Sequence, residues 1–217
     1  MISIDLAAAA ELSVTSTRPK VEDRGFMVDY LRRSAEAMVA FAEDEAAQAA
    51  MHDLAERIST SLAAGGRLLV AGNGGSAADA QHIAAEFTGR LMYDRRPLSA
   101  VALTTDSSSL TAISNDYGFA EVFARQVSAL GCPGDVFLGI STSGKSPNIL
   151  RAFQAARDAG VITAAFSGEA GIVGATCDVT VAVPSAWTPL IQQMHITAGH
   201  IVCGLVERTL CPQRVED

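Results

Sequence analysis

Residues 136–158 read VFLGISTSGKSPNILRAFQAARD, and this stretch decides the fold. Its first five residues, 136–140, form a continuously apolar run, which is typical of a buried parallel strand. A loop rich in Ser, Thr and Gly follows at 141–146, and a helical window runs over 146–158. The stretch therefore predicts a strand, a tight loop and a helix, which is the repeating unit of α/β folds.

The same alternation continues on both sides of this unit. Further short apolar runs lie at 68–71, 100–103, 161–166 and 179–183, and further helical windows lie at 76–89, 118–130 and about 190–209. Two more helical patterns precede the first strand, and Gly65-Gly66 ends the second of them. We therefore expect an α/β fold with a doubly wound, five-stranded parallel sheet, helices on both faces and additional N-terminal helices.

Composition limits the class of protein. The chain has 217 residues, which suits one α/β domain with a helical extension, and residues 1–25 are expected to be a loose N-terminal arm. The formal net charge is −8 and no basic stripe is present, so we expect no nucleic-acid partner. The longest apolar runs fall far short of the roughly 20 residues that cross a bilayer, so we expect no membrane span.

The N-terminus and the cysteines predict a cellular compartment. The apolar stretch at the N-terminus has no basic region before it, so we expect no signal peptide. The cysteines stand at 132, 177, 203 and 211 and form no C-x-x-C pair. We therefore expect reduced thiols in a cytoplasmic protein, without a zinc ribbon or a thioredoxin motif.

Three polar loops follow predicted strands, at 72–76, 104–106 and 141–146. The carboxyl ends of parallel strands share one edge of the sheet, so these loops should converge on one crevice. In the third loop, free N–H groups at a helix start favour an anion, and Gly144 allows the backbone to approach it closely. Four hydroxyls add donors for phosphate oxygens, those of Ser141, Thr142, Ser143 and Ser146.

Residues 139–146, GISTSGKS, also match the nucleotide P-loop pattern G-x-x-x-x-G-K-[ST]. A P-loop enzyme needs an Asp at the end of another strand to hold Mg²⁺, and only Asp106, in a loop, is available. The loop also carries more hydroxyls than a nucleotide cradle requires. A dinucleotide is weakly supported too, because Ala77 occupies the last glycine position of G-x-G-x-x-G. A P-loop NTPase therefore remains a remote alternative.

Two predicted helices carry side chains suited to metal binding or proton transfer. His82 and Glu86 are four residues apart and share one helix face, so they can bind one metal, act as acid and base, or form an ordinary surface or core pair. On the last helix, Gln192 and His200 are separated by about 80° and roughly 12 Å, so they converge on a common ion only with difficulty. His195 is expected to point elsewhere, into packing or a subunit contact.

Four blocks of sequence, in this order, resemble the phosphoheptose isomerases, which are sugar isomerase (SIS) domain proteins acting on sedoheptulose 7-phosphate. The blocks are GNGGSAADAQHIAAEFTGR at 72–90, SNDYGF at 114–119, GISTSGKS at 139–146 and IQQMHITAGH at 191–200. The likeness covers roughly residues 26–210, which implies that 26–217 is a single, flavodoxin-like SIS domain. Thr188-Pro189-Leu190 departs from relatives with an Asp before the Ile-Gln pair, which bears on sugar specificity or rate.

The resemblance implies a reaction and a role for each site residue. Sedoheptulose 7-phosphate would become an aldoheptose 7-phosphate through an enediol, with Glu86 as base and His200 as acid. One zinc per subunit would be bound by His82, Glu86, Gln192 and His200. The sugar would be contacted by Asn73, Gly74, Gly75, Asn115 and Asp116, together with Glu86 and Gln192. The phosphate would be held by Ser141, Thr142, Ser143 and Ser146. Family members are homotetramers with sites between subunits.

A second branch of the same family also resembles this chain. It is a tetrameric binding protein, not an enzyme, that helps to assemble the bacterial replication initiator. That branch lacks the acidic residue at the position of Glu86 and the histidine at the position of His200. The presence of both residues here favours the enzyme.

Overall fold

The computed structural model describes residues 21–172 and 174–213. The chain divides into two units, residues 1–36 and 37–217, and the described part of the first is the beginning of helix α1. The helices are α1 (Val21–Glu43), α2 (Glu45–Ala63), α3 (Gly75–Thr88), α4 (Ser107–Tyr117), α5 (Val122–Leu130), α6 (Pro147–Asp158) and α7 (Thr188–Leu210), with a 3-10 turn at Phe119–Glu121. The strands are β1 (Leu68–Gly72), β2 (Ala100–Ala102), β3 (Val136–Ser141), β4 (Ile162–Ser167) and β5 (Val179–Ala182).

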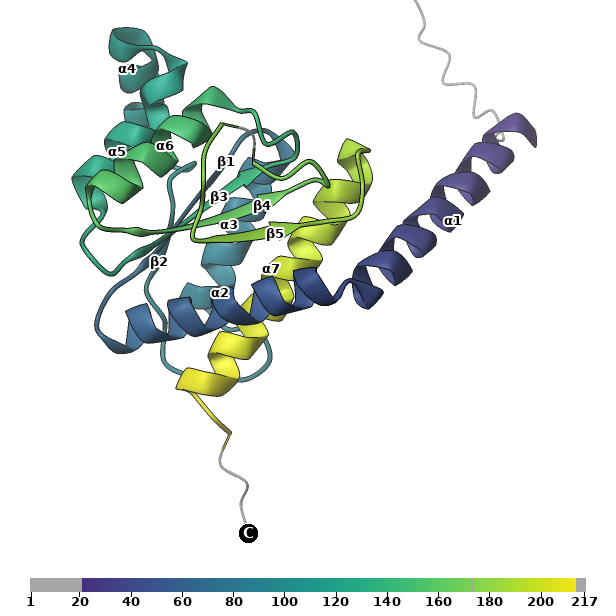
Figure 1. The fold of residues 1–217 in the computed structure, drawn as a ribbon, viewed down its shortest axis with the longest axis horizontal. Helices are drawn as coiled ribbons and strands as arrows, with labels where there is room; N and C mark the ends of the chain where they lie inside the picture. The colour runs from purple at the N-terminus through teal and green to yellow at the C-terminus, as the bar shows by residue number, and fades with distance from the viewer. Residues whose placement is uncertain (1–20, 173, 214–217) are drawn as a thin grey trace, which may run out of the picture. The chain divides into compact units, whose positions relative to one another are not determined.

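The five strands form one parallel sheet in the order β2-β1-β3-β4-β5 (Figure 1). This confirms the predicted doubly wound sheet, and the order is that of flavodoxin-like folds. The chain passes from β1 outward to β2 and then returns to β3 on the other side of β1. The carboxyl ends of β1 and β3 therefore flank the switch point, where sheets of this kind bind ligands.

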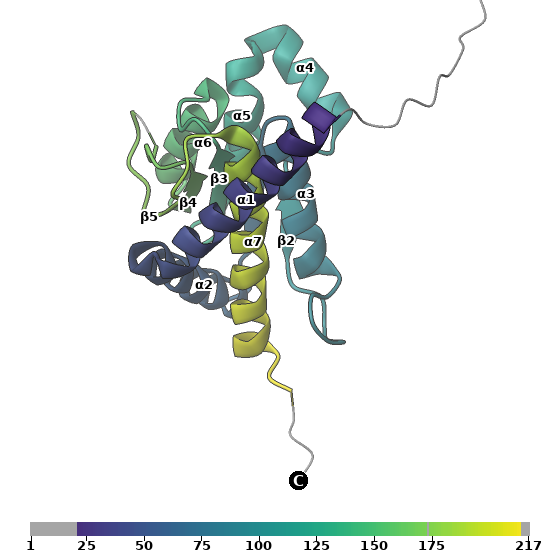
Figure 2. The same cartoon turned by 90° about the vertical axis from the view of Figure 1, so that its right-hand side faces the viewer.

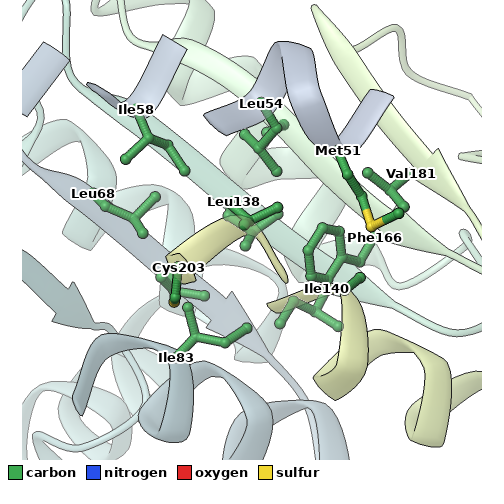
Figure 3. Close-up of a cluster of buried hydrophobic side chains, with 14 of the residues drawn as sticks. Met51, Leu54, Ile58, Leu68, Ile83, Leu138, Ile140, Phe166, Val181 and Cys203 are labelled. Carbon is green, nitrogen blue, oxygen red and sulfur yellow. The ribbon is translucent and has the colours of Figure 1, made fainter. Parts of the chain in front are cut away.

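Helices cover both faces of the sheet because alternate strand residues point to opposite sides. In β1, Leu68 and Val70 pack with α2, α3 and α7, whereas Leu69 and Ala71 pack with α5 and α6. The three layers are visible in two views (Figures 1 and 2). Figure 3 shows side chains of α2, α3 and α7 meeting those of β3 and β4 in the first of these cores. Burying apolar area of this kind is the main term that holds the layers together.

The junction between α1 and α2 falls where the sequence predicts a turn. Asp44 stands between the two helices, and its carboxylate accepts a hydrogen bond from the Ala47 N–H at 3.0 Å, which caps α2. Phe41, in the last turn of α1, is buried in the core. This end of α1 therefore belongs to the folded domain.

One helix was not predicted. Helix α4 occupies 107–117, where no helix or strand is expected from the sequence pattern. None of its residues is fully buried, and Leu110 and Ile113 pack only partly buried against the core, so its apolar pattern is short. The helix expected over 118–130 is shorter than predicted. Gly118 has φ of +87°, which is not a helical conformation, and α5 begins only at Val122.

Apart from α1, the limits of the other elements lie within one or two residues of the expectation. Helix α1 begins at Val21, inside the stretch expected to be an arm, and residues 1–20 lie outside the described part of the chain. The division into an arm and a single domain stays a prediction.

All four cysteines are free thiols, and Cys203 is buried in the core. Within the described residues, no helix combines the length and the apolar content that crossing a bilayer requires.

Candidate active site

The loops after β1 and β3 are joined by a pair of amides. Asn73, after β1, and Asn148, in the first turn of α6, exchange two hydrogen bonds of 2.9 and 2.8 Å. Asn148 is buried, so this pair fixes the two loops relative to one another. Gly74 stands at the N-cap of α3 with φ of +56°, a conformation that favours glycine. The structure thus brings the first and third predicted loops together.

The hydroxyl-rich loop is held closed at its ends. Ser141 Oγ and Ser146 Oγ are 3.0 Å apart, and the Thr142 carbonyl accepts a hydrogen bond from the Gly168 N–H at 3.2 Å. Gly144 has φ of +65°, and a Cβ at this position would collide with the Gly171 carbonyl oxygen. The loop thus leads directly into the N-terminus of α6, the position that suits an anion.

Asp106 does not provide the acidic residue that the P-loop alternative requires. Its carboxylate caps α4, accepting hydrogen bonds from the N–H groups of Ser108 and Ser109 and from Ser109 Oγ at 2.6 Å. The Ser109 hydroxyl is the main reason why the pKa of Asp106 lies below its usual value. This carboxylate is engaged as a helix cap.

Helices α3 and α7 bring three predicted metal ligands together. His82 Nε2 lies 3.1 Å from a Glu86 carboxylate oxygen and 3.0 Å from His200 Nε2. One ligand atom from each residue falls within 4.8 Å of the others. Two imidazoles and one carboxylate are a donor set that zinc accepts, and three protein ligands leave a position open as in catalytic sites. The side chains of these residues therefore fit the implied ion.

Gln192, on α7, lies against the start of α3. Its amide covers Gly75, where an added Cβ would overlap it. Gly75 precedes His82 by two helical turns, or about 10 Å along the axis. The role of Gln192 as a fourth ligand stays a prediction.

Asn115 and Asp116 are exposed in the last turn of α4. The Asn115 amide donates to the Asp116 carboxylate at 2.8 Å. Across the described residues, no hydrogen bond links this pair to the other predicted site residues. Their contact with the sugar stays a prediction.

Sequence reasoning missed a buried ion pair that anchors the end of α3. Arg95 and Glu207 meet at 2.7 Å, with side chains 3% and 0% exposed. Arg95 also donates to the Glu86 and Phe87 carbonyls, and Glu207 accepts from the backbone of residues 91 and 92. Burial opposes ionisation of Glu207, but these donors outweigh it and lower its pKa. The pair ties the turn that carries Glu86 to α7.

His195 lies in the core, which confirms the packing expectation. It is fully buried against Phe166, with ring centroids 5.7 Å apart. Neither ring nitrogen has a hydrogen-bond partner among the described residues. Burial lowers the pKa of His195 from 6.5 to about 4, so this ring is neutral at physiological pH.

Comparison with known proteins identifies the class and then the family. The family model for the SIS domain matches residues 29–168, so the chain belongs to the SIS-domain proteins. A phosphoheptose isomerase of Burkholderia pseudomallei (strain 1710b) is 51% identical over 186 residues, which cover 85% of this chain and 94% of that protein. Within the SIS-domain class, the chain is a member of the phosphoheptose isomerase family.

Solved structures agree with this assignment. Phosphoheptose isomerase GmhA from Neisseria gonorrhoeae superposes with a TM-score of 0.77 and 40% identity, covering 87% of this chain and 99% of that one. A phosphoheptose isomerase from Francisella tularensis has a TM-score of 0.81 and 34% identity, with coverages of 86% and 98%. The likeness therefore extends over almost the whole of both solved chains.

Proposed function

We propose that this protein is a phosphoheptose isomerase that converts sedoheptulose 7-phosphate to D-glycero-D-manno-heptose 7-phosphate for nucleotide-activated heptose biosynthesis. The observation that carries the proposal is the cluster of His82, Glu86 and His200, whose ligand atoms lie within 4.8 Å of one another. It occurs in a chain that also has a hydroxyl-rich loop at a helix N-terminus. Relatives that are half identical are named for this activity.

The residues divide the reaction between them. Glu86 removes the proton from C1 of the ketose and returns it to C2. A carboxylate positioned close to the two carbons can act in this way as a general base and then as its conjugate acid. His200 moves the proton between the two oxygens. Ser141, Thr142, Ser143 and Ser146 hold the phosphate, and Asn73, Gly74, Gly75, Asn115 and Asp116 hold the sugar. Binding the distant phosphate helps to orient the reacting carbons.

We infer a zinc ion at this cluster. His82, Glu86 and His200 would hold it, with Gln192 as a fourth ligand. Bound there, zinc would polarise the carbonyl and stabilise the negative charge that develops on the sugar oxygens.

We also infer a homotetramer, in the cytoplasm, with sites between subunits. An apolar groove of about 410 Å³ beside His200 supports this, with Met92, Ile201 and Leu205 in its lining. Met92 and Ile201 are 66% and 41% exposed in the single chain. Burying such a surface against another copy would close the site from water.

The test is conversion of sedoheptulose 7-phosphate by the purified protein, followed by NMR of the aldoheptose product with and without added zinc. Product formation that requires the protein supports the proposal. Lack of turnover in the presence of zinc, by a protein that is folded, would overturn it. Capture of a replication initiator by an inactive protein would instead favour the non-catalytic branch of the family.

A further inference from the structure

Helices α3 and α7 pack side by side (Figure 2), and small residues on both allow a close approach. A Cβ on Gly75 would overlap the Gln192 amide, and a Cβ on Gly199 would meet Ile83 at 2.8 Å. His82, two turns after Gly75 on α3, meets His200 of α7 at 3.0 Å. The contacts thus follow in the same order along α3 and α7. They mark the face of α3 that is turned toward α7.

Asp79 lies on this face of α3, between Gly75, which Gln192 covers, and His82, which meets His200. It follows Gly75 by four residues and precedes His82 by three, so all three share a face of α3. A helical side chain leans toward the N-terminus and covers the preceding turn. This lean would bring the Asp79 carboxylate over the turn of Gly75, which the Gln192 amide covers. Of the polar atoms in that amide, the nitrogen is nearer to Gly75 than the oxygen is.

The carboxylate of Asp79 has an unmet need for a donor. Its Oδ2 atom is buried and has no hydrogen-bond partner in the described part of the chain. Burial raises the pKa of Asp79 to about 6, against the opposing influence of His82. A buried carboxylate oxygen without a donor costs free energy. A hydrogen bond from a nearby N–H group would remove that cost.

We propose that Asp79 is a positioning residue whose carboxylate accepts a hydrogen bond from the Gln192 amide nitrogen, so that the Gln192 oxygen faces the cation held by His82, Glu86 and His200. The inference rests on the proposed metal site. An amide presents donors on one side and an acceptor on the other, so fixing its nitrogen also fixes its oxygen. Partners of this kind orient ligands in many metal sites.

The experiment measures zinc affinity by competition with a chromophoric chelator, using metal-stripped protein. The proteins are wild type, Asp79→Ala, Asp79→Asn, Gln192→Ala and the two double variants. Asp79→Ala is expected to weaken zinc binding by about 10–100-fold. Asp79→Asn retains an acceptor oxygen and is expected to lose less. In the Gln192→Ala background either change should alter the affinity by less than about threefold, because the group that Asp79 holds is absent.

Two results would overturn the inference. One is an unchanged zinc affinity in Asp79→Ala. The other is an equal loss in the presence and absence of the Gln192 side chain, which would indicate a general effect of charge or an action through His82. If Asp79→Ala does not fold, the same comparison of single and double variants is made with Asp79→Asn. Asp158→Ala, an exposed change on α6, is the matched control and should bind zinc as wild type does.

The failure of the metal site is a separate outcome. If the wild-type protein binds no zinc, the proposed site falls and the role of Asp79 falls with it. If the wild type binds zinc and the variants behave alike, only the inference about Asp79 fails.

Discussion

Glu86 is the residue on which the proposed chemistry depends most directly. Replacing Glu86 by Gln retains the shape of the side chain but removes the base, so kcat should fall by about 10²–10⁴-fold, the range that general base catalysis contributes. The measurement is turnover of sedoheptulose 7-phosphate by NMR at saturating substrate.

Helix α2 offers a matched control for this change. His52 and Glu56 have the same spacing of four residues and lie 3.8 Å apart, with side chains 66% and 68% exposed. Glu56→Gln should leave turnover unchanged. Near-wild-type activity in Glu86→Gln, or an equal loss in both variants, would contradict the assignment of Glu86.

These two His–Glu pairs also show how far sequence reasoning reaches at a single residue. Spacing predicts that each pair shares a helix face, and it cannot tell one pair from the other. What distinguishes His82 and Glu86 is His200, which comes from a helix more than a hundred residues away and lies 3.0 Å from His82. Contacts between helices distant in sequence are set by the packing of the whole fold, so family resemblance supplied what periodicity could not.

Buried His195 should make stability depend on pH. Its pKa is about 4 in the folded protein and near 6.5 when exposed. As pH falls through 6.5 toward 4, the unfolded state takes up a proton that the folded state does not, so the folded state loses stability. Between pH 7 and pH 5 this residue should remove about 2 kcal/mol from the free energy of unfolding.

The measurement is urea unfolding at both pH values for wild type, His195→Phe and His52→Phe. His195→Phe retains an aromatic ring beside Phe166 and should lose less stability on acidification than wild type. His52 is exposed, so its replacement should leave the pH dependence as it is in wild type. The same pH dependence in all three proteins would refute the assignment.

The loop at 141–146 is the element that should set affinity for the phosphate. Gly144→Ala places a Cβ against the Gly171 carbonyl and at a φ of +65°, so the loop must move. Left-handed strain alone is worth roughly 1–2 kcal/mol. We expect KM for the sugar phosphate to rise about tenfold or more, since 1.4 kcal/mol corresponds to a factor of ten.

A second glycine separates this effect from simple backbone strain. Gly134 has φ of +88° with open space around it, and it precedes β3, at the opposite end from the loop. Gly134→Ala should lower stability while KM stays as in wild type. An unchanged KM in Gly144→Ala would argue against phosphate binding by this loop.

The anchor between α3 and α7 is an element-scale device that no local pattern reveals. Arg95 and Glu207 are 112 residues apart in the sequence, and each resembles an ordinary surface charge until the fold buries both. Removing one partner leaves the other charge buried, so Glu207→Ala should lower the free energy of unfolding by about 3–5 kcal/mol.

Denaturant unfolding measures this loss, and the exposed pair of Asp53 and Arg57 on α2, at 2.9 Å, is the control. Asp53→Ala should remove no more than about 1 kcal/mol, because solvent screens an exposed pair. Similar losses in the two variants would show that the Arg95–Glu207 pair does not anchor the helices.

At the scale of the whole molecule, the sheet was predictable because five short apolar runs separated by helical windows leave few ways to build a parallel sheet. Helix α4 was not, since only Leu110 and Ile113 of this helix pack against the core and two such residues are too short a pattern to indicate a helix. The three loops that follow the strands could be placed at one edge by topology alone. The position of the Gln192 amide could not, because it depends on the separation of α3 and α7.

Assembly is the property that should respond to a single change on the surface beside the site. Ile201 is 41% exposed in the groove next to His200, and a charge there would be buried without a partner in the proposed tetramer. Ile201→Asp should therefore convert the tetramer to smaller species by light scattering and lower turnover with it. Leu130 on α5 is equally exposed at 41%, and Leu130→Asp should leave both mass and turnover unchanged.

A wild-type protein with the mass of one chain, or an Ile201→Asp variant that remains tetrameric, would rule out this groove as the subunit contact. Because the groove adjoins His200, the proposed catalytic acid, loss of mass and loss of activity should occur at the same protein concentration.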